Sequence, residues 1–289
     1  MQAKAQASVR ERRSFFKELS FRNWLRPSRE PFLDVFVRPV DANRRVARLL
    51  FIMGATWHNK CLFDIDSEEE SMADILNKMG IETYAFNNFG IGPEEKPAPI
   101  GNFHQRNIDA AIDIIRRYDI DYIMPYSYGC LMTSKILEEV KVKGTILVDP
   151  CPRGQGITKQ KIAGGKLLVA KSVIAKAIKE VAKSPINDHM LEMYLKHLCD
   201  GEYLTTAEYP VTESIAQKEA FLSKDNILAL YKTGPINVVF TSGVSSEVQA
   251  VFPKEGLLHY PKASHWIFLE DDRYQLARDV LDFVKKANT

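Results

Sequence analysis

The sequence alternates short, continuously apolar runs with longer segments whose apolar residues recur at helical spacing. Residues 47–54, "ARLLFIMG", form one such run, and residues 144–150, "GTILVDP", form another. A strand that is apolar at every position is typical of a parallel sheet covered by helices on both faces. The alternation of runs and helical segments therefore predicts an α/β fold with a mostly parallel, doubly wound sheet.

The same pattern continues along most of the chain. Further strands are expected at residues 81–86, 121–126, 235–243 and 256–261, and an antiparallel edge strand at 32–40. One helix is expected at residues 67–80, where Ser67 would begin the helix and Gly80 would follow its end. The remaining helices of the core are expected at residues 102–119, 129–140 and 271–288.

The interval between Asp149 and Pro235 carries little strand pattern. It is rich in helix-forming segments, including residues 166–183, and it is too long for a structureless loop. We therefore expect a helical lid over residues 152–234, inserted into a core that comprises residues 31–151 and 235–289. Residues 1–30 are polar with scattered aromatic side chains and are expected to form a basic N-terminal extension.

Composition narrows the class of protein. A chain of 289 residues with 45% hydrophobic residues can bury one core with an insertion. We expect no transmembrane segment and no secretory signal, because no apolar run is long enough for either. The four cysteines are widely scattered, which is typical of reduced thiols in the cytoplasm and not of a zinc site or a disulfide framework.

The basic residues are concentrated in two segments. Residues 1–31 hold eight Lys or Arg against three Glu, and residues 159–183 hold seven Lys against one Glu. Neither excess extends over a whole face, so nucleic-acid binding is not expected. On the expected helix at 166–183, Lys176, Lys179 and Lys183 lie opposite the apolar side. A solvated polar face is the favoured interpretation, and the alternative is a docking face for an anionic surface or an acyl carrier.

The junction between the expected strand at 121–126 and the helix that follows has almost no loop. It reads Pro125-Tyr126-Ser127-Tyr128-Gly129. A serine on such a turn is a nucleophile elbow, which strains the serine backbone and projects its Oγ above the sheet. Small residues two positions to either side permit the turn, and here Gly129 keeps this rule while Pro125 replaces the usual glycine. The alternative is that Ser127 is an ordinary helix N-cap.

From about residue 31 to 286 the chain resembles the α/β-hydrolase fold superfamily. Beside the elbow, the matching stretches are "FIMGATWH" (51–58), "NNFGIG" (87–92), "LVDP" (147–150) and "PKASHWIFLEDD" (261–272). The resemblance implies that Ser127 is a nucleophile and that His265 is its general base. It also implies an oxyanion hole formed by the backbone N–H groups of Ala55 and Tyr128.

The carboxylate that should orient His265 is the open point of this resemblance. The family's acid follows the strand that ends here at Gly243, usually three residues later. Ser246 stands at that place, and Glu247 follows it. We favour Glu247 as the acid, with Asp149 at the end of the preceding strand as the alternative. A third alternative is that no carboxylate serves this role.

The implied reaction is hydrolysis of an ester or thioester of an apolar acyl group through an acyl-enzyme. The acyl group would belong to a small molecule or to a carrier, and neither a metal nor an organic cofactor is implied. Thr56 and His58 lie beside the implied oxyanion loop and are candidates for substrate contact, although a structural or solvent-exposed role for His58 is favoured. Candidate residues for lining an acyl pocket in the lid are Leu168, Met190, Met193 and Tyr194.

Two other functions remain open. Pro125, Met53, Asn87 and the displaced acid depart from the family pattern, and they favour a hydrolase-like binding or effector protein with little or no catalysis. The same triad would also support acyl transfer to an acceptor other than water. Fold alone does not separate these functions.

Overall fold

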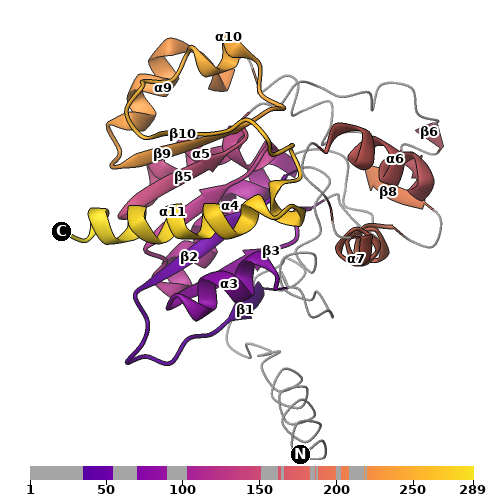
Figure 1. Ribbon diagram of the computed structural model, residues 1–289. Coiled ribbons are helices and arrows are strands. Elements are labelled where there is room, and N and C mark those ends of the chain that lie inside the picture. Colours follow the sequence, from indigo (N-terminus) through magenta and orange to yellow (C-terminus); the bar gives the residue numbers. More distant parts are fainter. Residues whose placement is uncertain are drawn as a thin grey trace, which may run out of the picture. The chain divides into compact units, whose positions relative to one another are not determined.

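A seven-stranded sheet forms the centre of the computed structural model (Figure 1). The structure describes residues 35–54, 70–89, 103–150, 162–163, 166–182, 186, 188–199, 203–207, 218 and 220–289. The predicted extension at residues 1–30 lies outside them. The strands of the sheet are β1 (Val35–Arg38), β2 (Ala47–Ile52), β3 (Ile81–Phe86), β4 (Tyr122–Pro125), β5 (Gly144–Val148), β9 (Ile236–Thr241) and β10 (Leu257–Tyr260).

The strands are ordered β1-β3-β2-β4-β5-β9-β10. Every neighbouring pair is parallel except β1 with β3, which is antiparallel. The sequence prediction of a mostly parallel sheet with an antiparallel edge strand is therefore confirmed. The central strands β2, β4 and β5 are buried at nearly every position, as their continuous apolar runs indicated.

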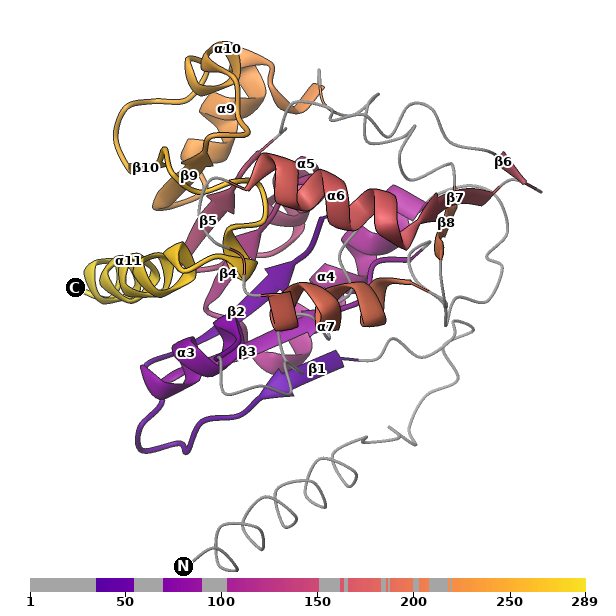
Figure 2. The same ribbon diagram turned by 45° about the vertical axis from the view of Figure 1, so that its right-hand side comes forward.

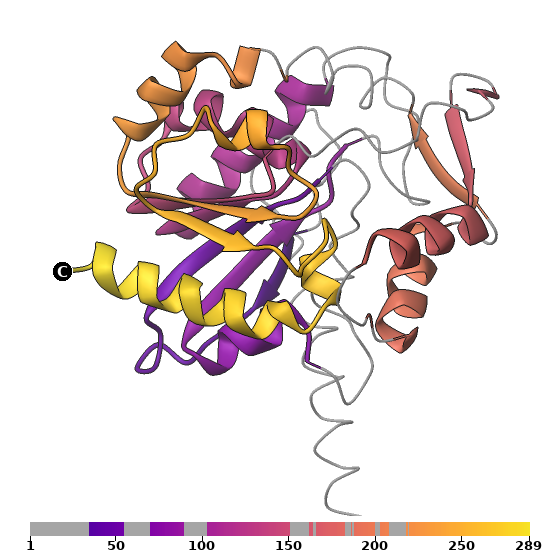
Figure 3. The ribbon, with the colours of Figure 1, turned by 45° about the horizontal axis from the view of Figure 1, so that its top comes forward.

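Helices cover both faces of the sheet. On one face, α3 (Met72–Lys78) and α11 (Asp272–Ala287) pack on the strands, and Figures 1 and 3 show them side by side. A second apolar cluster lies on the other face. The helices of that face are α4 (Phe103–Tyr118), α5 (Tyr128–Glu139), α9 (Lys224–Tyr231) and α10 (Ser246–Gln249). The sheet is doubly wound, as predicted.

The chain reverses its direction across the sheet between β2 and β4. From β2 it continues to β3 on one side, and from β4 onward it proceeds through β5 and β9 to β10 on the other side. In open α/β sheets, ligands bind at the carboxyl ends of the strands beside such a switch point. Ser127 follows β4 directly, so the turn singled out from the sequence lies at this point.

The start of α3 differs from the prediction. Its N-cap is Ser71 and not Ser67. The Ser71 hydroxyl accepts a hydrogen bond from the N–H of Asp74, and the Asp74 carboxylate accepts one from the N–H of Ser71. This capping box satisfies two N–H groups at once and begins the helix at Met72. Gly80 follows the end of the helix with a φ of 86°, as expected.

The interval between β5 and β9 contains strands as well as helices. A three-stranded antiparallel sheet has the order β6-β7-β8, and two helices accompany it (Figure 2). The elements are β6 (Ile162–Ala163), β7 (Lys166–Ala170), α6 (Lys171–Val181), α7 (Asp188–Leu198) and β8 (Tyr203–Ala207). The predicted helix at 166–183 is therefore wrong over its first five residues, 166–170. These residues form β7, which pairs with β8 at residues 203–207. Helix propensity depends on neighbouring residues only, so it does not reveal pairing with a strand more than 30 residues away.

This interval contacts the core through apolar side chains. Ile178 of α6 and Leu191 of α7 belong to the same buried cluster as Phe268, which precedes α11. Ile186 forms an isolated antiparallel bridge with Glu270. By contrast, α9 lies within the predicted lid range but packs on α5 of the core. Whether the interval acts as a lid remains a prediction.

No helix in the described part of the chain is long and apolar enough to cross a membrane.

Candidate active site

Ser127 occupies a strained turn between β4 and α5. Its φ of 53° and ψ of −115° lie outside the regions that residues other than glycine favour. Its N–H donates to the carbonyl of Val148, and its side chain makes no capping hydrogen bond to α5. The geometry is thus that of a nucleophile elbow and not that of an ordinary N-cap. Strain of this kind costs about 1–3 kcal/mol and tends to occur at functional sites.

The turn is tight because its neighbours are small or lack an N–H. A Cβ on Gly129 would lie 2.0 Å from the carbonyl oxygen of Ile52, so only glycine fits there. A Cβ on Gly54 would lie 3.0 Å from the Cβ of Ser127. Pro125 has no N–H to donate, and the pairing of β4 with β5 is interrupted at Met124 and Pro125 before an isolated bridge joins Tyr126 to Val148. Proline is therefore compatible with the elbow in the position of the usual glycine.

His265 lies between two polar partners. Its Nε2 is 3.1 Å from the Oγ of Ser127, and its Nδ1 is 3.0 Å from Oδ2 of Asp149. The serine follows β4, the aspartate follows β5 and the histidine follows β10, so three separate strand ends converge on one point. A serine, an imidazole and a carboxylate linked in this order form the arrangement of a catalytic triad.

Asp149 is fully buried, and other groups hold it in place. Its Oδ1 accepts the N–H of Thr241 at 2.7 Å, and its Oδ2 accepts the Thr241 hydroxyl at 2.5 Å. The φ of Asp149 is 47°, a second strained backbone at the same edge of the sheet. Sequence reasoning did not identify Thr241; the available signal was a threonine at the end of an expected apolar strand.

Glu247, which we favoured from the sequence, is not beside His265. Ser245 caps the short helix α10, and Val248 of that helix is buried against the core. Glu247 precedes Val248 and is exposed to solvent. The loop after Gly243 thus folds into a helix that carries its carboxylate away from the imidazole. The carboxylate next to His265 is that of Asp149, the alternative that the sequence left open.

The loop that carries His265 is fixed by a buried carboxylate. Glu270 accepts hydrogen bonds from the N–H and the hydroxyl of Ser264, and the Ser264 hydroxyl in turn accepts the N–H of Trp266. Burial raises the pKa of Glu270, against the two hydrogen bonds from Ser264, which lower it. Both neighbours of His265 in the chain are therefore anchored.

Of the two residues implied to form the oxyanion hole, the structure describes Tyr128, and on the other side it describes the chain as far as Gly54. Tyr128 is the first residue of α5, at the positive end of the helix dipole. The side-chain amide of Asn88 donates to the carbonyls of Met53 and Gly54 and so fixes the backbone that leads into Ala55. Asn88 was missed from the sequence, although it lies within the "NNFGIG" stretch. Ala55, Thr56 and His58 themselves lie outside the described residues.

His104 of α4 is buried beside the elbow. Its Nδ1 lies 3.1 Å from the hydroxyl of Tyr128, and burial lowers its pKa from 6.5 to about 4. In the unfolded chain the imidazole binds a proton below pH 6.5, whereas in the folded chain it does so only below about pH 4. The free energy of unfolding should therefore fall as the pH drops from 6.5 to 4, by up to about 3 kcal/mol from this residue.

We expect His104→Gln to remove this part of the decline, as measured by urea unfolding at pH 7 and pH 4.5. Glutamine retains a group that can accept a hydrogen bond from Tyr128. His259→Gln, at an exposed position, is the matched control and should retain the full decline. An equal decline in His104→Gln and in wild type would show that His104 does not remain neutral in the folded protein.

The predicted pocket-lining residues of α7 are buried, and Met190 and Tyr194 belong to the apolar cluster that also contains Phe268. Met190 and Tyr194 are almost fully buried, and Met193 is 8% exposed. The cluster also contains Tyr126, which precedes Ser127. Leu168 lies in β7, where its side chain is outside the described part of the structure. Their contact with an acyl group remains a prediction.

Two of the lysines predicted to form a cationic face have acidic neighbours. Lys176 lies 3.6 Å from Glu180, and Lys179 lies 2.7 Å from Asp188. Both ion pairs are exposed, and they reduce the net positive charge that this face presents. Lys183 lies outside the described residues. Docking to an anionic surface or carrier remains a prediction.

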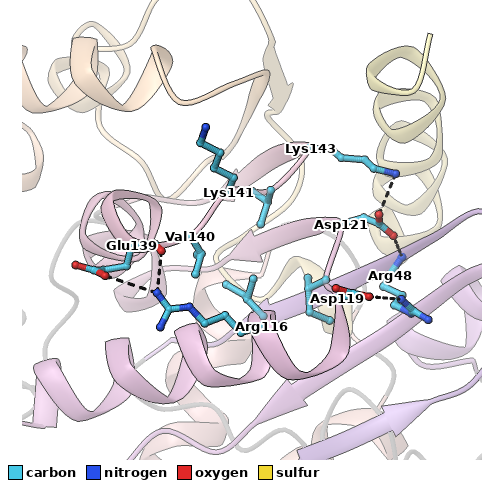
Figure 4. A pocket seen from close by; sticks show the side chains of 11 residues that line it. Arg48, Arg116, Asp119, Asp121, Glu139, Val140, Lys141 and Lys143 are labelled. Carbon is cyan, nitrogen blue, oxygen red and sulfur yellow. Dashed lines mark hydrogen bonds and ion pairs between the residues drawn. The ribbon is translucent and has the colours of Figure 1, made fainter.

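A groove of about 700 Å³ lies at the opposite edge of the sheet, at the amino ends of β2, β4 and β5 (Figure 4). Its acidic side chains each have a basic neighbour within the groove. The pairs are Arg48–Asp119, Arg116–Glu139 and Lys143–Asp121. Because each acidic charge of the groove has a basic partner inside it, the groove gives no separate indication of a ligand site. Nowhere in the described residues do three His, Cys, Asp or Glu side chains gather as a metal site would require.

Neither a protein-family model nor a curated protein sequence matches the chain. Solved structures do. Monoacylglycerol lipase from Paleococcus ferrophilus matches with a TM-score of 0.65 and 13% identity, over 89% of this chain and 100% of that one. A soluble variant of monoglyceride lipase from Saccharomyces cerevisiae, in complex with a substrate analog, matches with a TM-score of 0.60 and 15% identity, over 90% and 94% of the two chains.

A thermophilic esterase from Thermogutta terrifontis also matches, with a TM-score of 0.58 and 13% identity, over 89% of this chain and 94% of that one. At such low identities the likeness is one of fold. It confirms the α/β-hydrolase fold predicted from the sequence motifs.

Proposed function

On this α/β-hydrolase fold, we propose that the chain is a serine hydrolase that cleaves an ester or a thioester of an apolar acyl group. One observation carries the proposal: Ser127, His265 and Asp149 form a continuous chain of hydrogen-bonding contacts, with separations of 3.1 Å and 3.0 Å. The strained φ of Ser127 supports it, because strain without a function is rarely retained.

In the proposed reaction, the Oγ of Ser127 attacks the acyl carbonyl carbon while Nε2 of His265 takes the hydroxyl proton. Nε2 then gives this proton to the leaving alcohol or thiol, and the acyl group stays on the serine. A water molecule attacks the acyl-enzyme in the same way, with His265 again taking and returning a proton. Asp149 holds Nδ1–H of the imidazole and stabilises its positive charge.

Asp149 is well suited to this role because each of its carboxylate oxygens accepts a hydrogen bond from Thr241. Thr241 donates two hydrogen bonds to the carboxylate, which helps to compensate for its burial. The carboxylate therefore has a fixed position beside the imidazole.

The negative charge that develops on the carbonyl oxygen requires hydrogen-bond donors. We propose the backbone N–H groups of Tyr128 and Ala55, with Asn88 fixing the chain that leads to Ala55. A single donor of this kind is worth about 2.7–4 kcal/mol in the transition state.

An apolar acyl group is favoured by the surroundings of the elbow. Met53 and Tyr126, on either side of the switch point, are fully buried in the same apolar cluster as Met190 and Tyr194. The lipases and the esterase with similar structures support the same class of substrate. Transfer of the acyl group to an acceptor other than water would use the same residues.

The test is hydrolysis of a series of p-nitrophenyl esters from acetate to dodecanoate by the purified chain. We expect kcat/KM to rise with acyl length beyond acetate, because each buried CH₂ contributes about 0.8 kcal/mol. Matched thioesters would rank the two leaving groups. Absence of turnover across the whole series, with a folded protein, would favour the binding or effector function instead.

A further inference from the structure

The residue before the serine makes an unusual set of contacts with the histidine. The ring of Tyr126 is stacked on the imidazole of His265, with ring centroids 4.8 Å apart and an angle of 21° between the planes. The hydroxyl of the same tyrosine donates a hydrogen bond to the backbone carbonyl of His265. A single side chain therefore contacts both the ring and the main chain of the proposed base.

Tyr126 itself is held from several directions. Its N–H donates to the carbonyl of Ile52 at 2.9 Å, which ties it to the neighbouring strand. Its ring makes an edge contact with Phe268, at a centroid distance of 5.0 Å, and it is fully buried. Gly54 leaves room for the ring, because a Cβ there would lie 3.2 Å from Cδ1 and Cε1 of Tyr126. The ring thus has a fixed position from which to hold another group.

We propose that Tyr126 is a positioning residue for His265. The tyrosine ring fixes the plane of the imidazole and stabilises the protonated imidazole during acyl transfer. The inference rests on the proposed function, and it adds a fourth side chain to the three of the triad. Ser127 and Asp149 fix the two nitrogens of the imidazole, and Tyr126 covers one of its faces. Because Tyr126 adjoins Ser127 in the chain, a single turn holds both the nucleophile and its base.

The physical basis is the negative face of an aromatic ring. A cation over such a face gains about 0.5–1 kcal/mol at exposed sites and more when it is desolvated. The titratable groups near His265 in the described residues are Tyr126 at the elbow, Asp149 after β5 and Glu270 after the short helix η2 (Ile267–Leu269), and the neutral hydroxyl of Ser127 faces its Nε2. Asp149 also favours the protonated imidazole, so the contribution of Tyr126 must be measured by changing Tyr126 alone.

The experiment compares Tyr126→Leu and Tyr126→Phe with wild type by the rate of fluorophosphonate labelling from pH 5 to pH 9. Labelling requires neutral His265, so the rate rises with pH through the pKa of this group. Without the ring, the pH at half-maximal rate should fall by about half a unit, and the maximal rate should fall roughly threefold, because both effects come from the same loss of stabilisation of the protonated imidazole. Tyr126→Phe keeps the ring, so its half-maximal pH should stay unchanged.

Phe283→Leu is the matched control. It also replaces a buried aromatic residue of the same cluster by leucine, but Phe283 lies on α11, where its ring contacts Tyr122. It should leave the half-maximal pH in place. An unchanged or higher half-maximal pH in Tyr126→Leu would overturn the inference, and so would an equal downward shift in Phe283→Leu.

A second measurement separates this inference from the proposed function. NMR titration of the imidazole signals, with His265 identified by their loss in His265→Asn, reports the pKa of His265 even if the chain has no hydrolytic activity. If the probe labels the wild-type protein and the pKa of His265 is lower in Tyr126→Leu, both the proposed function and this inference are supported. A wild-type protein that never labels contradicts the proposed function, while the titration still decides the effect of Tyr126 on the imidazole.

Discussion

Replacing Ser127 with Ala is expected to abolish covalent labelling by a fluorophosphonate probe and to lower ester hydrolysis roughly 10⁶-fold. The probe reacts only with a serine whose proton can be taken as it attacks. Nε2 of His265, 3.1 Å from the Ser127 Oγ, is placed to take it. His265→Ala should abolish labelling as well, because the hydroxyl alone is a poor nucleophile.

Ser134→Ala is the matched control, since Ser134 lies on the same helix α5 and away from the turn. It should be labelled as fully as wild type. Mass spectrometry of the labelled protein should locate the adduct on Ser127. A folded wild-type protein that remains unlabelled would contradict the serine hydrolase proposal and favour a binding or effector function. Labelling that persists in Ser127→Ala would move the nucleophile to another serine.

Replacing Asp149 with Asn is expected to lower kcat about 10³–10⁴-fold with a smaller change in KM. The amide cannot accept a hydrogen bond through its nitrogen, so the imidazole would be held in the wrong tautomer and its positive charge would lose its partner. Thr241 donates two hydrogen bonds to Asp149, so the amide would also disturb these contacts. Thermal unfolding of the variant separates a loss of stability from a loss of activity.

Glu247→Gln is the matched control, because it makes the same carboxylate-to-amide change on the exposed helix α10. Its kcat should stay within twofold of wild type. A larger loss of kcat in Glu247→Gln than in Asp149→Asn would identify Glu247 as the acid. That result would require a different conformation of the loop after Gly243. If neither variant loses activity, the reaction proceeds with Ser127 and His265 alone.

The sequence by itself determined the class of fold and the position of the turn. Continuous apolar runs such as 47–54 and 144–150 are typical of strands covered on both faces, and these runs became β2 and β5. The elbow was readable because its requirements are local: a strand, a serine and a glycine within five residues. His265 was nominated by the resemblance of residues 261–272 to the loop that precedes the last helix in α/β-hydrolases.

The tertiary structure alone decided which groups surround the imidazole. Asp149 and His265 are 116 residues apart, and nothing in the sequence near either one shows that their side chains meet. Glu247 stood in the expected loop, but a serine cap and a buried valine made that loop a helix and turned the carboxylate to solvent. The stack of Tyr126 on His265 likewise joins residues from two distant segments. Local patterns specify elements and turns because their interactions span a few residues, whereas contacts between strand ends depend on the order and register of the whole sheet.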